Sequence, residues 1–135
     1  MSRNPATTVY IALTGLFALI AFFQPFTFGL GYFGASDGFD LHEVLGFVVL
    51  HSLTLLILIA ALVSPERRRL AWWALGLLVL VTVQISLIEF RDDAAGVAAL
   101  HPLLGVSALL MAGWMHWRAR RPAHPAPSAP AATGT

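Results

Sequence analysis

Four long apolar runs follow one another along the chain, separated by short polar stretches. A transmembrane helix needs about 20 apolar residues, and the runs cover about 7–28, 41–63, 70–90 and 97–117. Backbone in hydrocarbon must satisfy its own hydrogen bonds, so each run is expected to be a helix. Short connections make consecutive helices antiparallel. The pattern predicts an all-α integral membrane protein with a four-transmembrane-helix up-down bundle over residues 1–121, followed by a Pro- and Ala-rich, disordered cytoplasmic tail over 122–135.

The composition supports a membrane protein and narrows its chemistry. Of the 135 residues, 58% are hydrophobic and 11% are charged, and the mean hydropathy is +0.77. A soluble domain carries about a quarter charged residues, so lipid must be the solvent for much of this surface. The chain has no cysteine, which excludes disulfide and thiolate chemistry. We expect the lipid bilayer as the main partner and no binding of nucleic acid.

The arginines are divided unevenly between the two sets of helix ends. Seven belong to one set: Arg3, Arg67, Arg68, Arg69, Arg118, Arg120 and Arg121. Arg91 is alone on the other side. Because basic residues favour the cytoplasmic side of a membrane, both termini are expected in the cytoplasm. The sequence therefore predicts a multi-pass protein of the bacterial cytoplasmic (inner) membrane, with the connections near 37–43 and 89–93 outside.

Two ten-residue stretches of the chain are nearly alike. LHEVLGFVVL begins at position 41 and LHPLLGVSAL at position 100, and five of the ten positions are identical. Gln24 precedes His42 by 18 residues, and Gln84 precedes His101 by 17. Each half is an apolar helix with a late glutamine, an acidic outer loop and a helix opening Leu-His-x-x-Leu-Gly. This predicts two tandem helical hairpins related by a parallel repeat, with the two histidines opposite each other at one depth.

A glycine follows each of these histidines by four residues. Gly46 and Gly105 therefore lie on the same helix face as His42 and His101, one turn deeper. A missing side chain lets either a neighbouring helix or a flat ligand approach the backbone. Helix packing alone would account for both glycines, and interhelical hydrogen bonds would account for the two glutamines. The sequence is compatible with a flat ligand and with helix packing at these positions.

The remaining polar positions have simpler interpretations. His51 lies nine residues beyond His42, which rotates it half a turn toward a neighbouring helix or lipid. His116, in the stretch GWMHWRARR, belongs to an aromatic belt of four tryptophans at the membrane surface. Asp40 stands just before the second run and is expected to cap that helix.

Two imidazoles that face each other across a dry bundle can hold an iron porphyrin as axial ligands. A zinc or copper site would want a third or fourth ligand close by, and none is evident. We expect haem b between the second and fourth helices near the outer face, with His42 and His101 on the metal. The residues expected around the cofactor are Gln24, Gly46, Gln84 and Gly105, with Arg91 as a partner of the haem propionates.

These motifs carry two resemblances. Gln24 with FGLGYF, then DLHEVLG, Gln84 and ALHPLLG, resembles a family of small four-helix bacterial membrane proteins of unknown function, over about residues 7–120. That resemblance implies the fold and no activity. The architecture also resembles half of haem A synthase, a four-helix bundle whose second and fourth helices each give one histidine to a haem near the outer face. Only His42 and His101 match this pattern, and there is one bundle rather than two and no catalytic glutamate motif, so haem A synthesis is not implied.

Two functions follow from these observations. The first is a small membrane b-type cytochrome that moves single electrons between a quinone or a redox partner protein and an outer acceptor. The alternative is a non-haem four-helix membrane protein, such as an accessory subunit, a quinone-binding module or a small-ligand transport component, whose histidines and glutamines form interhelical polar contacts. The sequence has no nucleophile–base pair, phosphate loop or metalloprotease motif. An electron carrier or binding protein is therefore expected rather than an enzyme, and no catalytic residue is assigned.

Overall fold

A computed structural model describes residues 3–121 of the chain, and this part is helical throughout, with no strand. The elements are α1 (Pro5–Tyr32), α2 (Gly38–Glu43), η1 (Val44–Leu50), α3 (His51–Val63), α4 (Arg67–Ser86), η2 (Leu87–Phe90), α5 (Ala95–Ala98) and α6 (Leu100–Arg120). The segment η1 is a π-helix, and η2 is a 3₁₀-helix. The tail expected over 122–135 lies outside the described residues.

Four helical spans are long and apolar enough to cross a membrane: Pro5–Tyr32, Gly38–Val63, Arg67–Phe90 and Ala95–Arg120. The elements α2, η1 and α3 follow without a break and form the second span. Each span contains one of the expected apolar runs and begins two or three residues before it. The prediction of an all-α, four-helix membrane bundle is confirmed, and the chain is a multi-pass membrane protein.

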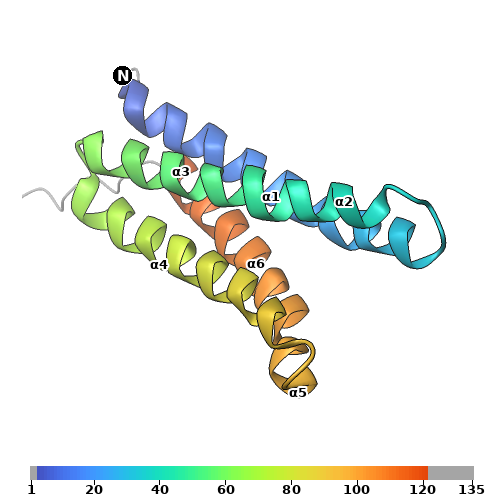
Figure 1. Cartoon of the computed structure of the whole chain (residues 1–135). Helices are drawn as coiled ribbons and strands as arrows, with labels where there is room; N and C mark the ends of the chain where they lie inside the picture. Colours follow the sequence, from blue (N-terminus) through green and yellow to red (C-terminus); the bar gives the residue numbers. More distant parts are fainter. Residues whose placement is uncertain (1–2, 122–135) are drawn as a thin grey trace, which may run out of the picture.

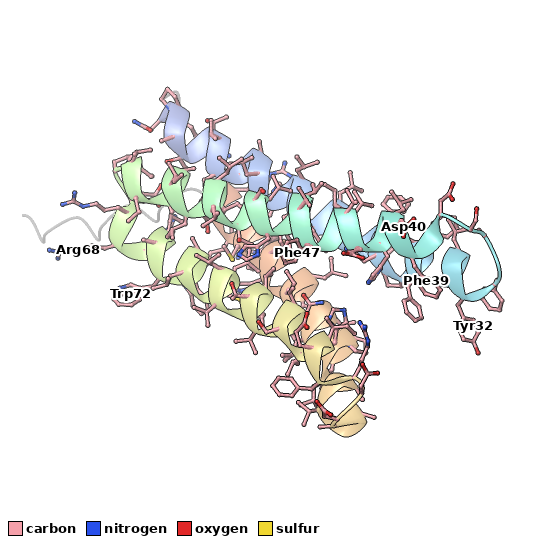
Figure 2. The ribbon with its side chains drawn as sticks, viewed as in Figure 1. Tyr32, Phe39, Asp40, Phe47, Arg68 and Trp72 are labelled. Atoms are coloured by element: carbon pink, nitrogen blue, oxygen red, sulfur yellow. The ribbon has the colours of Figure 1, made fainter. Side chains whose placement is uncertain are left out.

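The spans pair into two hairpins, α1 with α2–η1–α3 and α4 with α6, which pack on each other through α1 against α6 and α3 against α4. The hairpins lie close together where α3 turns into α4 and diverge toward α2 and α5 (Figure 1). Within the described residues, the backbone of α2 lies close only to α1 and the adjoining η1. We call the first end the arginine end, because it carries Arg67–Arg69 and Arg118–Arg121, and the opposite end the histidine end. Figure 2 shows Arg68 and Trp72 at the arginine end and Tyr32, Phe39 and Asp40 at the histidine end.

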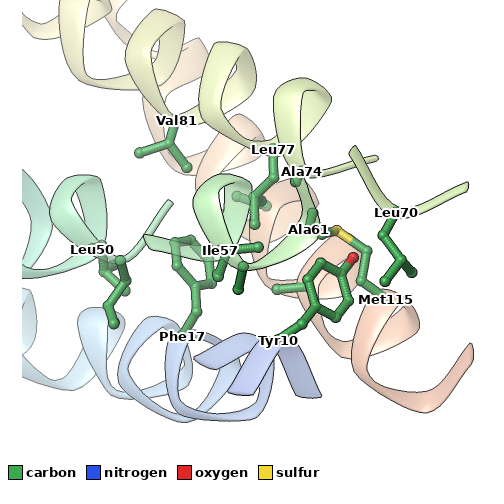
Figure 3. Close-up of a cluster of buried hydrophobic side chains, with 14 of the residues drawn as sticks. Tyr10, Phe17, Leu50, Ile57, Ala61, Leu70, Ala74, Leu77, Val81 and Met115 are labelled. Atoms are coloured by element: carbon green, nitrogen blue, oxygen red, sulfur yellow. The ribbon is translucent and has the colours of Figure 1, made fainter. Parts of the chain in front are cut away.

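A buried apolar core joins the hairpins in the centre and at the arginine end (Figure 3). Its largest side chains are Tyr10, Phe17, Ile57, Leu77 and Met115. Three fully buried alanines lie among them: Ala61, Ala74 and Ala112. Small residues let helix backbones approach closely, and such packing drives helix association in lipid. In the described chain, no apolar side chain beyond Ala21, Leu50, Val81 and Ala108 is buried toward the histidine end, so the core holds one end and leaves the other open.

The turn between α1 and α2 depends on glycine. Gly34 adopts φ 97°, a left-handed conformation that favours glycine. Gly38 touches the backbone of α1, since a Cβ atom there would lie 2.1 Å from the Gly31 nitrogen. This contact starts the helix at Gly38 and leaves Asp40 inside its first turn. The expectation that Asp40 caps the helix is wrong for this reason.

The arginine end carries the aromatic belt that the sequence predicts. The Trp73 and Trp114 rings lie 4.5 Å apart, centroid to centroid. The Arg118 guanidinium lies 5.0 Å from the Trp114 ring centroid, and the Arg121 guanidinium lies 3.5 Å from that of Trp117. Amphipathic rings and cations of this kind suit the level of the lipid head groups.

A substitution of Ala112 tests the close packing of the core. Ala112 is fully buried, so Ala112→Leu overpacks the interface and is expected to lower the free energy of unfolding by about 1–3 kcal/mol. Thermal unfolding in detergent, followed by far-ultraviolet circular dichroism, measures the loss. Leu110→Ala, at an exposed position of the same helix, is the control and should change Tm little. Equal Tm values for Ala112→Leu and the unsubstituted protein would contradict this description of the core.

Candidate functional site

The two histidines of the repeated motif come together at the histidine end. His42 lies in α2 of the first hairpin, and His101 is the second residue of α6 in the other hairpin. Both are half-buried. Their ring centroids are 6.4 Å apart, and the ring planes are inclined by 57°. Two residues separated by 59 positions in the chain therefore face each other across the gap between the hairpins.

In the first hairpin, His42 is tied to the end of α1. Its Nδ1 lies 3.1 Å from the carbonyl oxygen of Gln24 and 3.2 Å from Thr27 Oγ1. The Gln24 side-chain amide in turn donates to the carbonyl oxygen of His42 at 3.3 Å. The Thr27 hydroxyl donates to the Gln24 carbonyl at 2.9 Å. These bonds fix the orientation of the imidazole against its own hairpin.

The second hairpin repeats this arrangement with His101 and Gln84. His101 Nδ1 lies 2.8 Å from the carbonyl oxygen of Gln84. The Gln84 amide nitrogen is almost equidistant from the two ring nitrogens, at 3.3 and 3.2 Å. In the ring plane, an atom so placed would collide with the carbon between those nitrogens. The amide therefore lies over the face of the ring rather than in its plane.

The bonds to carbonyl oxygens determine the tautomer of both rings. A carbonyl oxygen can only accept, so Nδ1 carries the proton in His42 and in His101. A neutral imidazole protonated at Nδ1 has its lone pair on Nε2, which is the atom available to a metal. Hydrogen bonding of the second ring nitrogen to a carbonyl is also how metal-ligating histidines are commonly held. The two rings are thus matched in tautomer and in the glutamine carbonyl that holds Nδ1, and they differ in their other contacts.

No hydrogen bond joins the two halves of the site within residues 3–121. The bonds of His42 go to Gln24 and Thr27, and those of His101 go to Gln84, always inside one hairpin. The same part of the chain has no cluster of three or more His, Asp or Glu side chains suited to a metal ion. A metal between the hairpins would have two protein ligands, as a six-coordinate haem iron does.

The structure shows what fills the space above the two glycines. A Cβ atom on Gly46 would lie 2.9 Å from the Gln24 amide nitrogen, and one on Gly105 would lie 3.5 Å from that of Gln84. The missing side chains therefore make room for the glutamine amides. Of the two partners that the sequence left open, a neighbouring helix or a flat ligand, the helix that carries the glutamine occupies this space.

Arg91 stands apart from the histidines. Its side chain is exposed, and its Nε lies 3.7 Å from Asp92 Oδ2. It makes no hydrogen bond or ion pair with the histidine and glutamine side chains in the described region. Among residues 3–121, the structure thus brings together both histidines, both glutamines and both glycines but not the arginine.

Sequence reasoning missed Thr27, Phe28 and the π-helix η1. Thr27 follows Gln24 by three residues, a spacing that puts it on the same helix face, whereas Leu87 stands at the matching place in the second hairpin. Phe28 packs edge-on against His42, with centroids 5.6 Å apart. The π-helix begins two residues after His42, and such segments are rare and often found at functional sites. The spacing of Thr27 from Gln24 was a readable signal; the apolar sequence of η1 contained none.

The other described histidines serve different contacts. His51 points toward α4, with its Nε2 3.5 Å from Thr82 Oγ1. His116 donates from Nδ1 to the carbonyl oxygen of Ile11 at 2.8 Å. A Cβ atom on Gly15 would lie 2.9 Å from the His116 ring. His116 is thus a packing residue between α1 and α6, close to the predicted belt.

Substitution of the glycine below His42 tests this arrangement. Alanine in place of a helical glycine normally stabilises a protein by about 1 kcal/mol. Gly113→Ala meets nothing within 4 Å and should show this gain. Gly46→Ala should instead lower Tm, because the Gln24 amide must move away from the His42 carbonyl. Differential scanning calorimetry in detergent compares the two, and an equal gain for both would contradict the contact.

Residues 24–91, which include His42 and Gln84 but not His101, match a family model described as "Family of unknown function (DUF6220)". The matched segment is 68 residues long, half of the 135-residue chain. The chain matches no curated protein and no solved structure. The chain belongs to DUF6220, a family of unknown function.

Proposed function

We propose that this protein is a small membrane b-type-cytochrome-like protein that binds one haem between its second and fourth spans, for electron transfer. The observation that carries the proposal is the pair of imidazoles, one from each hairpin, whose Nδ1 atoms are bonded to carbonyl oxygens, so that the lone pair of each ring is on Nε2. His42 and His101 are the residues that would hold the haem iron.

The distance between the rings agrees with this assignment. A metal–imidazole bond is about 2 Å long, and an imidazole centroid lies about 1 Å behind its nitrogen. Two opposed imidazoles on one iron therefore have centroids about 6 Å apart. The observed 6.4 Å is close to this value.

Bound haem would supply an iron that gains and loses one electron at a potential set by its ligands and surroundings. The chain's own residues hold the ligands. Gln24 and Gln84 orient the rings through their backbone carbonyls, and their amides pack above Gly46 and Gly105. Thr27 adds a hydroxyl beside His42 Nδ1, a contact that His101 lacks within the described residues.

The surroundings of the site supply the rest of the proposal. The divergence of the hairpins at the histidine end leaves this half of the bundle without a buried apolar core. Arg91, the one arginine near this end, is the proposed partner of the propionates. By the distribution of arginines, the arginine end lies in the cytoplasm and the haem lies near the outer face of the bacterial inner membrane. A quinone or a redox partner protein is the proposed source or acceptor of electrons.

One observation favours the alternative of a protein without haem. Every hydrogen bond of the site lies within one hairpin, so His42 and His101 are held in place with no ligand between them. In that case the histidines and glutamines would be interhelical polar contacts, and the protein would be an accessory subunit, a quinone-binding module or a transport component.

Absorption spectroscopy separates the two functions. The full chain, produced with ample haem supply and purified in mild detergent, should show a Soret band and sharp α and β bands after reduction with dithionite. His42→Ala and His101→Ala should each abolish or shift these bands, because each removes one axial ligand. Glu43→Ala, which changes an exposed neighbour of His42, should leave the spectrum unchanged.

Two results would count against haem. One is a colourless protein that is nevertheless folded, as judged by its circular dichroism. The other is a chromophore that survives both histidine substitutions unchanged, since the pigment would then be bound elsewhere.

A further inference from the structure

His51 lies near the middle of the span Gly38–Val63 and is half-buried. The proposed haem site does not use it. Ionisable side chains at membrane depth are costly, and they usually mark a functional site and have an identifiable partner. His51 is therefore expected to have a hydrogen-bond partner for each ring nitrogen, and its contacts show which nitrogen has none.

The one hydrogen bond that the His51 ring makes within the described residues is a weak one. Its Nε2 lies 3.5 Å from Thr82 Oγ1 on α4, at the outer limit for such a bond. The Thr82 hydroxyl already donates to the carbonyl oxygen of Leu78 at 2.8 Å, so its oxygen can only accept from Nε2–H. In that tautomer the lone pair is on Nδ1, which has no partner in residues 3–121. Since hydrocarbon contains no water to bond it, a ligand with a hydrogen-bonding group is expected there.

His51 and Thr82 lie on facing helices of the two hairpins, and Phe47 lies beside them in η1. The edge of one ring meets the face of the other between Phe47 and His51, with centroids 6.4 Å apart and planes at 84°. Phe47 is 58% exposed, and Figure 2 shows it in the angle between the first hairpin and α4. We call Phe47, His51 and Thr82 the wedge, because they lie where the hairpins begin to diverge.

We propose that the wedge binds the head group of a membrane quinone. A quinone is a flat ring that resides in hydrocarbon, and its oxygens are carbonyl acceptors when oxidised and hydroxyl donors when reduced. Phe47 offers the ring an aromatic surface for stacking. Thr82 and His51 are the polar groups that orient one of its oxygens.

The two neutral tautomers of His51 match the two states of such a ligand. With the proton on Nε2, donated to Thr82, the Nδ1 lone pair accepts from a quinol hydroxyl. With the proton on Nδ1, the ring donates to a quinone carbonyl, while the Thr82 hydroxyl turns from Leu78 to Nε2. Exchange of the tautomer turns Nδ1 from an acceptor into a donor at the same place, and neither tautomer requires a buried charge.

This site rests on the proposed function in one respect, because a quinone so placed would be the electron donor or acceptor of the haem. His51 is nine residues from His42, about 13 Å along a helix, and on the same span. The wedge therefore lies deeper in the bilayer than the histidine pair, where the ring of a quinone can enter sideways from lipid.

Titration of the full chain with ubiquinone-1 in lipid nanodiscs tests the proposal. Isothermal titration calorimetry, corrected with empty nanodiscs, should show saturable binding at one site per chain. His51→Leu should weaken this binding at least about tenfold, through the loss of a hydrogen bond in hydrocarbon. Thr82→Val should weaken it less. Ser107→Ala, which removes a hydroxyl bonded to its own helix in the same way as Thr82, should bind as the unsubstituted chain does.

Circular dichroism identifies variants that fail to fold, and Thr82→Val provides the test if His51→Leu is among them. Equal affinities in folded His51→Leu and the unsubstituted chain would overturn the proposal, and so would the absence of saturable binding. If light scattering shows that His51→Leu changes the oligomeric state while ubiquinone-1 does not bind, the wedge is a contact with a second copy and the proposal is wrong.

The same titration on protein produced without haem keeps the two proposals apart. Binding of ubiquinone-1 to a chain that shows no haem absorption under any condition would support the wedge and contradict the haem. A haem spectrum with no quinone binding would do the reverse.

Discussion

The site depends on one constraint, that a polar group in hydrocarbon must find its partner within the protein. Each histidine of the repeated motif meets it in the same way, by donating from Nδ1 to the carbonyl oxygen of a glutamine at the end of the preceding span. That bond sets the tautomer and holds the ring beside the glutamine, whose amide lies above a glycine. The chemistry proposed for His42 and His101 follows from these consequences.

The buried core and the proposed ligand sites lie in different parts of the bundle. The buried core, which draws on α1, α3, α4 and α6, lies in the centre and at the arginine end. Alanines there let the helices approach closely. Toward the histidine end the side chains between the hairpins are only partly buried. Since a core resists deformation, the hairpins can diverge without loss of fold. The proposed haem site lies in the part of the molecule that the core leaves open, and the proposed quinone site lies at the edge of the core, next to Leu50 and Val81 in the chain.

The fold could be predicted well from the sequence because lipid restricts the choices. An apolar run long enough to cross the bilayer can only be a helix there. Each of the four helical spans contains one of the four runs predicted from the sequence. The repeated Leu-His-x-x-Leu-Gly also indicated that His42 and His101 would face each other, and in the structure their rings are 6.4 Å apart. Function was not predictable to the same degree, because two histidines fit several roles.

Other features of the site depend on contacts between helices, which the pattern of residues along the chain does not reveal. Asp40 did not cap its helix, because the approach of Gly38 to Gly31 moved the helix start. The roles of Gly46 and Gly105 depended on the glutamine rotamers, which are set by the neighbouring span. The π-helix η1 has an ordinary apolar sequence that does not distinguish it from an α-helix. Thr27 was the exception, since its spacing from Gln24 could have identified it.

The most direct test of the central claim is the low-temperature electron paramagnetic resonance spectrum of the oxidised protein. Two neutral imidazoles on one ferric haem produce a low-spin signal, and we expect that signal as the main species. It should give way to a high-spin signal when either His42 or His101 is replaced by alanine. A high-spin signal in the unsubstituted protein would show that the two histidines do not share one iron, and the absence of any haem signal would contradict the account altogether.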